Sequence, residues 1–279
     1  MGMRISGSVV CRPLVRLGRK AWLAGFTVLL LACEASNDAA LAGEDTFDHS
    51  DWDAILEANV TEAGWVNYKQ VKAKYADLLG RYLKALGDAN VDKLKSREET
   101  MAFWINAYNA ICLQKILDNA IPDSVPRALI FGTNIFKERT YRVGGKIRSL
   151  DDIEHGILRK DFKDPRVHSA LVCAASSCPR LRSESYTGAR LNDQLDEQAR
   201  HWVQVGKDKS GERKNHLDRP NKVYYASKIF EWFQEDFGDS DAGVLAFLKR
   251  HGSKEDAEFL DKNKVQVRYL TYIWKVNSQ

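Results

Sequence analysis

Apolar side chains recur at helical spacing over much of the chain after His49, and this pattern predicts a helix-rich domain. The clearest helix is expected over residues 97–119, which are apolar nearly all round and should therefore be buried. Ser96 and Glu99 give this helix the sequence pattern of a capping box, and Pro122 prevents its continuation. Further helices are predicted to begin near Asp51, Leu78, Leu150, Leu191, Lys228 and Val244.

A few short strands are predicted between the helices. Residues 140–148 should form a hairpin, because their Gly-Gly pair admits the positive φ that a two-residue turn needs. Residues 223–225 and 265–274 have strand-like alternation, and the apolar, β-branched stretch 166–173 predicts a buried strand. Residues 206–220 are expected to be a solvated loop. These elements predict an α+β fold, a helix-rich single domain around a small, mainly antiparallel sheet.

The first 32 residues differ in charge from the rest of the chain. They contain five basic residues and no acidic ones, so removing them from the formal charge of +4 leaves −1 for the remainder. The remainder therefore offers nucleic acid no net positive field. The basic start and the apolar run 21–32 are typical of a signal peptide, since spanning a bilayer takes about 20 apolar residues.

Two processing sites follow the apolar run. Residues 30–33 resemble a bacterial lipobox, which would place a lipid on Cys33, whereas residues 40–42 resemble an A-x-A cleavage site. The lipobox directly follows the apolar run, so we place it slightly ahead. The expected organisation is a signal peptide over 1–32, a tether over 33–48 and a globular domain over 49–279. The domain should be exported to the periplasm, touching the membrane only through the lipid if the lipobox is used.

Export makes a disulfide the natural state of neighbouring cysteines. Cys173 and Cys178 lie five residues apart in a small polar turn, which predicts such a pair. Cys112, inside the central helix, is expected to be a small buried hydrophobe. The same turn also admits a second interpretation, in which one of the two thiols is a nucleophile.

In this catalytic interpretation His155 or His168 is the base, with Glu154 or an asparagine orienting it. On a strand, residues 168 and 173 would face opposite sides, so His155 is the better placed base for Cys173. A papain-like arrangement is not expected, because no cysteine stands at the start of the central helix. Neither a metal nor a cofactor is expected, since Cys-x4-Cys is not a zinc pattern and no phosphate-binding motif occurs.

Further polar residues are expected to support a site near this turn. Asn106 and Asn109 lie three apart in the buried central helix, so the backbone of another segment or a site must satisfy their amides. Ser176, Ser177 and Arg180 follow Cys173 closely and are candidate binding residues.

Several of these stretches together resemble the DUF547 family, a group of domains named for their unknown function. The resemblance covers roughly residues 49–275 and departs from the family pattern at Thr271 and Ile273, where Pro and Asp are expected. It implies a set of recurring residues and no mechanism. The stretches that carry it are 102–110, 149–159, 164–181, 186–187 with the following helix, and 227–233.

Two functional hypotheses follow from the sequence. The first is an exported cell-envelope enzyme that uses thiol–imidazole chemistry on an amide, a thioester or a disulfide. The second is a non-catalytic envelope binding domain in which the two cysteines form a structural disulfide. In both, the partner or substrate is an envelope molecule that the sequence does not identify, and nucleic acid is not expected.

Overall fold

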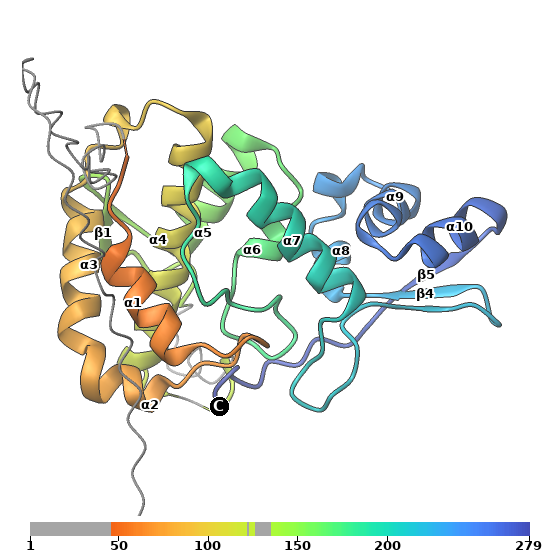
Figure 1. Cartoon of the computed structure of the whole chain (residues 1–279), viewed down its shortest axis with the longest axis horizontal. Helices are drawn as coiled ribbons and strands as arrows, with labels where there is room; N and C mark the ends of the chain where they lie inside the picture. The colour runs from red at the N-terminus through yellow and green to blue at the C-terminus, as the bar shows by residue number, and fades with distance from the viewer. Residues whose placement is uncertain (1–45, 122, 126–134) are drawn as a thin grey trace, which may run out of the picture. The chain divides into compact units, whose positions relative to one another are not determined.

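The computed structural model describes residues 46–121, 123–125 and 135–279, shown in colour in Figure 1. The chain divides into two units, Met1–Leu41 and Ala42–Gln279, and all described residues belong to the second. The predicted signal peptide, Cys33 and both processing sites lie outside the described residues. Among the helices that are described, none combines the length and the hydrophobicity needed to cross a membrane.

Helices dominate the described part of the chain, which confirms the predicted helix-rich α+β class. The α-helices are α1 (Ser50–Asn59), α2 (Tyr68–Gln70), α3 (Ala76–Asp88), α4 (Arg97–Asp118), α5 (Leu150–Ile153), α6 (Val167–Ala170), α7 (Leu191–Gln204), α8 (Lys228–Trp232), α9 (Asp241–His251) and α10 (Lys254–Lys262). Two π-helical segments are η1 (Val71–Tyr75) and η4 (Glu154–Phe162), and three 3₁₀ turns are η2 (Val91–Lys93), η5 (Gly188–Arg190) and η6 (Gln234–Phe237).

Helix α4 forms the centre of the core, as its all-round apolar sequence predicts. Side chains along nearly its whole length are buried, including Trp104 and Ile105. Only half of the predicted capping box forms. The Ser96 hydroxyl accepts the Glu99 backbone N–H at 2.9 Å, but the Glu99 carboxylate does not reach back. It accepts the backbone N–H groups of Phe47 and Gly188 instead, which joins the start of α4 to two distant segments.

The strands form two separate small sheets rather than the single sheet that was predicted. Strands β1 (Tyr141–Val143) and β2 (Lys146–Arg148) make the expected antiparallel hairpin, with positive φ at both turn glycines. Strand β4 (Val223–Ala226) pairs antiparallel with β3 (His216–Asp218) and parallel with β5 (Gln266–Tyr269). Strand β3 lies in the region that was expected to be a solvated loop. It was not predicted because its three residues are too short and mixed a stretch to carry an alternating pattern.

The predicted buried strand over residues 166–173 is wrong. Residues 167–170 form the single helical turn α6, and only the residues after it are extended. Asp164 favours the turn by accepting the Arg166 backbone N–H at 2.9 Å, and the Ser169 hydroxyl donates back to the Arg166 carbonyl. The segment therefore belongs to no sheet, and the strand geometry that disfavoured His168 as a partner of Cys173 does not apply.

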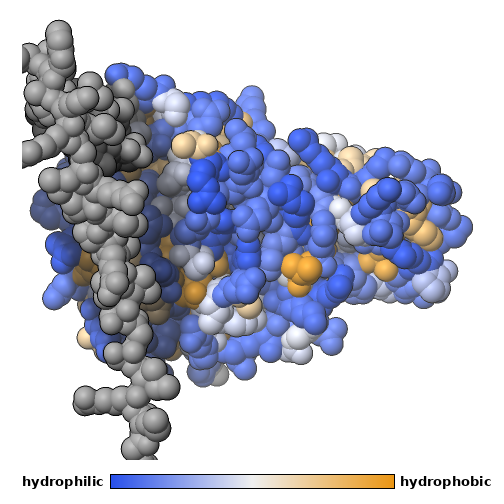
Figure 2. Space-filling view, viewed as in Figure 1, coloured by the Kyte–Doolittle hydropathy of each residue, from blue (hydrophilic) through white to orange (hydrophobic). Residues whose placement is uncertain are grey.

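The predicted strand over residues 265–274 is shorter in the structure, where β5 ends at Tyr269. The C-terminal segment, residues 270–279, continues from β5 in extended form past several loops (Figure 1). Isolated bridges pair Lys275 with Ser124, Val276 with Ala175, and Ser278 with Val66. The bridge between Val276 and Ala175 fixes the segment against the turn that carries the two cysteines. The face seen in Figure 2 is mainly hydrophilic with small, separate hydrophobic spots, so it offers no broad apolar docking surface.

Candidate functional site

Cys173 and Cys178 are joined by a disulfide, with Cα atoms 6.3 Å apart. Cys178 is buried and Cys173 is partly exposed. The Tyr272 hydroxyl, from the C-terminal segment, lies 3.0 Å from one sulfur and 3.1 Å from the other. Disulfide sulfurs carry no hydrogen, so the hydroxyl is the donor. The pairing is the state that the spacing predicts in an oxidising compartment.

Cys112 is free and buried, as predicted from its place in the central helix. Burial raises the pKa of its thiol to about 12, so no thiolate forms at neutral pH. This cysteine is therefore an apolar core residue and takes no part in a reactive site.

The turn between the two cysteines is held by backbone contacts with the C-terminal segment. The Ser176 N–H donates to the Lys275 carbonyl at 2.7 Å, and the Ser177 N–H donates to the Ile273 carbonyl at 3.2 Å. Both hydroxyls are also engaged: Ser176 accepts the Lys209 N–H at 2.6 Å, and Ser177 accepts the Ile273 N–H at 2.8 Å. The two serines thus position neighbouring loops rather than presenting free hydroxyls.

Neither predicted base has a hydrogen bond to a sulfur in the described part of the chain. His168 is buried and its Nε2 lies 2.6 Å from the Asp236 carboxylate, while its ring stacks on Phe233 at 4.3 Å. His155 is exposed, and its Nδ1 lies 2.6 Å from a guanidinium nitrogen of Arg159. Burial lowers the pKa of both imidazoles. The structure thus shows no thiol–imidazole pair.

Asp236 joins His168 to Arg159, forming a polar cluster that the sequence did not reveal. Arg159 Nε donates to the Asp236 carboxylate at 2.5 Å, and its guanidinium lies 4.9 Å from the centre of the Phe233 ring. Burial alone would raise the pKa of Asp236, but the hydrogen bonds from His168 and Arg159 lower it to about 2. Asp236 comes from η6, which lies more than sixty residues away in the chain, so local sequence carried no signal for the pairing.

Glu154, the predicted orienter, contacts neither histidine. Its carboxyl accepts a hydrogen bond from the Tyr108 hydroxyl at 3.1 Å. Burial raises the pKa of Glu154 to about 7, because the hydrogen bond and the nearby Arg159 only partly offset the loss of solvent. The carboxyl is therefore divided between its neutral and charged forms near neutral pH.

The two asparagines of α4 bind the backbone of other segments. Asn106 donates to the Tyr186 carbonyl at 2.7 Å and accepts the Tyr186 N–H at 2.9 Å. Asn109 donates to the Ala170 carbonyl at 3.0 Å and accepts the Val172 N–H at 2.9 Å. Each side chain thus supplies the pair of bonds that a neighbouring strand would make. The sequence left open whether another segment's backbone or a site would bind these amides, and the structure shows backbone partners for both.

Arg180, a predicted binding residue, is also occupied by contacts within the fold. Its guanidinium donates to the side chains of Gln198 and Glu197, at 2.9 and 2.8 Å, and to the carbonyl of Glu62. Arg180 therefore connects the turn after Cys178 to α7.

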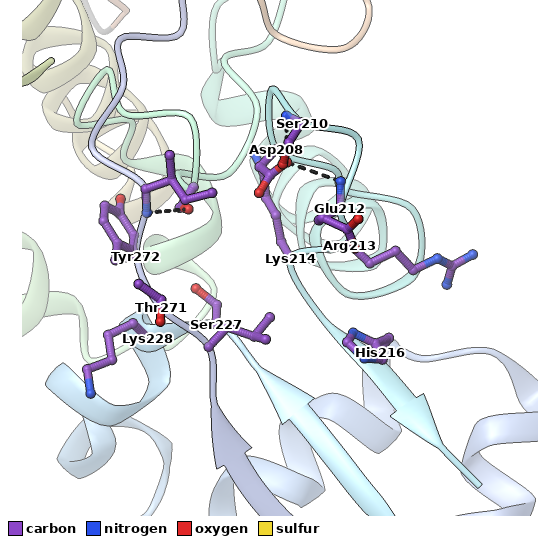
Figure 3. A pocket seen from close by; sticks show the side chains of 13 residues that line it. Asp208, Ser210, Glu212, Arg213, Lys214, His216, Ser227, Lys228, Thr271 and Tyr272 are labelled. Atoms are coloured by element: carbon purple, nitrogen blue, oxygen red, sulfur yellow. Dashed lines mark hydrogen bonds between the residues drawn. The ribbon is translucent and has the colours of Figure 1, made fainter.

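A cavity of about 280 Å³ lies beside the disulfide turn, with Tyr272 and Thr271 on one side (Figure 3). The loop that carries Asp208 and Lys214 forms the other side. Both of these charged side chains are buried, although the composition of residues 206–220 predicted a solvated loop. The Lys214 ammonium donates to the Cys178 carbonyl, which connects the cavity directly to the disulfide turn. No cluster of three or more His, Cys, Asp or Glu side chains suited to a metal occurs among the described residues.

Comparisons with known proteins give one finding. Comparison with curated proteins and comparison with solved structures return no significant match. Residues 91–203 match the family model described as "Protein of unknown function, DUF547". The match supports the resemblance seen in the sequence over a stretch that includes α4, both asparagines and the disulfide, whereas Asp208, Lys214 and Tyr272 lie beyond it.

Proposed function

We propose that this chain is an exported, non-catalytic binding domain of the cell envelope, in which the Cys173–Cys178 disulfide is structural. One observation carries the proposal: both sulfurs are consumed by the disulfide and contacted by Tyr272, and neither His155 nor His168 reaches them. The groups needed for thiol–imidazole catalysis are thus used elsewhere in the fold.

The leader supports the location in the envelope. Its basic start, apolar run and lipobox direct the chain out of the cytoplasm, and the mature protein is held at the membrane by a lipid on Cys33. An oxidising compartment then keeps Cys173 and Cys178 paired. The partner is an envelope molecule that enters the cavity beside Tyr272.

The competing function is an enzyme whose Cys173 thiol is activated by His155. It is tested by reducing the folded protein and measuring the rate at which iodoacetamide alkylates Cys173 at neutral pH. We expect the slow rate of an ordinary thiol with a pKa of about 8.5, and the same rate in a His155→Ala variant. His155 is exposed, so this variant should fold, and Lys160→Ala on the same π-helical segment is the matched control.

Fast alkylation of wild-type protein that is lost in His155→Ala and kept in Lys160→Ala would overturn the binding-domain proposal. It would show an imidazole-activated thiolate, and the enzyme would replace the binding domain as the best account.

A further inference from the structure

Two buried side chains of opposite charge line the cavity beside the disulfide turn without pairing with each other. Lys214 is 7% exposed and Asp208 is 8% exposed. No ion pair joins them in the described part of the chain. Burial lowers the pKa of Lys214 to about 8, and the nearby Asp208 charge offsets this effect only in part. Buried charges are stable only when other groups compensate them, and here each charge is compensated by hydrogen bonds to the fold rather than by the other.

The contacts of each group leave part of its hydrogen-bonding capacity open. The Lys214 ammonium donates to the Cys178 carbonyl, which uses one of its three N–H groups, and its other close neighbour is the Trp65 ring at 6.0 Å. Asp208 accepts three hydrogen bonds through Oδ1, from the Ser210 N–H, the Ser210 hydroxyl and the Glu212 N–H. Among the described residues, no donor reaches its second oxygen, Oδ2.

The cavity beside them suits a small ligand. Its volume of about 280 Å³ is near the lower end of the roughly 300–1,000 Å³ typical of ligand pockets. Across from Asp208 and Lys214, the wall is formed by the segment that carries Thr271 and Tyr272 (Figure 3). A ligand held by its charged groups at one side would therefore turn its carbon atoms toward Thr271 and Tyr272 at the other.

We propose that this cavity binds a free α-amino acid, whose carboxylate is received by Lys214 and whose ammonium is received by Asp208. An α-amino acid carries both charges on one carbon, so it matches two opposite charges on the same side of one small cavity. Binding would add charge-assisted hydrogen bonds at the remaining Lys214 N–H groups and at Asp208 Oδ2. The inference rests on the proposed binding function and names the class of its ligand.

Three matched probes test the proposal by titration calorimetry on the folded, disulfide-bonded protein. Alanine carries both charges, propionate carries only the carboxylate, and ethylamine carries only the ammonium. We expect alanine to bind at least about tenfold more tightly than either single-charge probe, a difference of about 1.4 kcal/mol. Asp208→Asn should reduce alanine binding at least about tenfold without a comparable loss of propionate binding.

Lys214→Met should weaken both alanine and propionate. If either variant fails to fold, the probe series on wild-type protein decides the matter alone. Propionate binding as tight as alanine would overturn the proposal in favour of a simple anion site, and no alanine binding would overturn it outright. Neither result changes the alkylation rate of Cys173, so failure of the ligand class is distinguishable from failure of the binding-domain function.

Discussion

Asn106 and Asn109 show how single side chains replace secondary structure in this fold. Each amide closes two hydrogen bonds with the backbone of one other segment, at Tyr186 and around residues 170–172. All the groups involved are buried, so none has water as an alternative partner. The position of the disulfide turn relative to α4 therefore depends on the Asn109 clamp.

Replacing either asparagine by alanine leaves a buried N–H and a buried carbonyl without partners. Each unpaired group costs about 1–3 kcal/mol, so we expect Asn109→Ala and Asn106→Ala each to lower the free energy of unfolding by about 2–4 kcal/mol. Urea denaturation measures the change. Gln114→Ala on the same helix is the control. Among the described residues its amide bonds only to the exposed Asp118 side chain, so the change in stability should be less than about 0.5 kcal/mol. Equal effects at positions 109 and 114 would refute the clamp.

Glu154 gives the fold a pH dependence of predictable sign. Burial raises its folded pKa from 4.5 to about 7, so the folded state holds a proton that the unfolded state releases as the pH rises through this range. This contribution to stability is fully present below about pH 4.5 and is lost as the pH rises to about 7.

A Glu154→Gln variant should therefore gain stability relative to wild type as the pH rises. We expect near-equal unfolding free energies at pH 4.5 and an advantage of about 1–3 kcal/mol for the variant at pH 8, since one pKa unit corresponds to about 1.36 kcal/mol. Urea denaturation of both proteins at both pH values measures the difference. All other titrating groups are the same in the two proteins, so their contributions cancel. An advantage that shrinks with rising pH would contradict the buried carboxyl.

Among the elements, those with strong local signals could be predicted from the sequence. Local sequence alone specifies α4, through its length and apolar surface, and the hairpin, through its Gly-Gly turn. Both elements formed as expected. Residues 166–173 did not form the predicted strand, because their apolar composition suits a buried helical turn as well as a strand. The Asn109 side chain accepts the Val172 N–H, which a neighbouring strand would otherwise bind. Strand β3 formed within a region whose composition predicted a loop.

The candidate site was predictable only where its partners are close in the chain. The spacing of Cys173 and Cys178 predicted their pairing, which the structure contains. Tyr272 lies 99 residues after Cys173, and Asp236 lies 68 residues after His168, so no local pattern could connect them. The buried charges at Asp208 and Lys214 were missed for a similar reason, since the Lys214 ammonium donates to the carbonyl of Cys178, 36 residues earlier in the chain.

The disulfide should stabilise the turn moderately rather than hold the domain together. It closes a loop of only a few residues, which corresponds to about 2 kcal/mol, and the turn is also bonded to Asn109 and Lys275. We expect a Cys173→Ser, Cys178→Ser double variant to remain folded and to lose about 2 kcal/mol in urea denaturation. Dithiothreitol should lower wild-type stability by the same amount and leave the variant unchanged. Complete unfolding of the double variant would contradict this account.

At the scale of the whole molecule, the proposed location depends on the leader. A lipid on Cys33 would place the folded domain at the membrane surface, separated from it by the tether over residues 33–48. The negative charge of the remainder gives no added attraction to an anionic lipid surface, so the anchor alone would hold it there.

Lipidation is tested with the full chain expressed in a Gram-negative bacterium supplied with a labelled palmitate analogue. We expect the label on the wild-type protein, its loss in Cys33→Ala, and its retention in Ala42→Arg, which blocks only the alternative cleavage site. Labelled protein in the Cys33→Ala variant would exclude the lipobox, and unlabelled wild-type protein would favour cleavage after Ala42.

The state of the two cysteines in the exported protein tests the central claim most directly. Alkylation under denaturing conditions without reduction, followed by trypsin digestion and mass spectrometry, reports it, because the peptide over residues 167–180 contains both cysteines and no other. The account predicts that this peptide carries no alkyl group and weighs two hydrogens less than its reduced form, while Cys112 is alkylated. A peptide with both cysteines alkylated before reduction would show free thiols and contradict the structural disulfide.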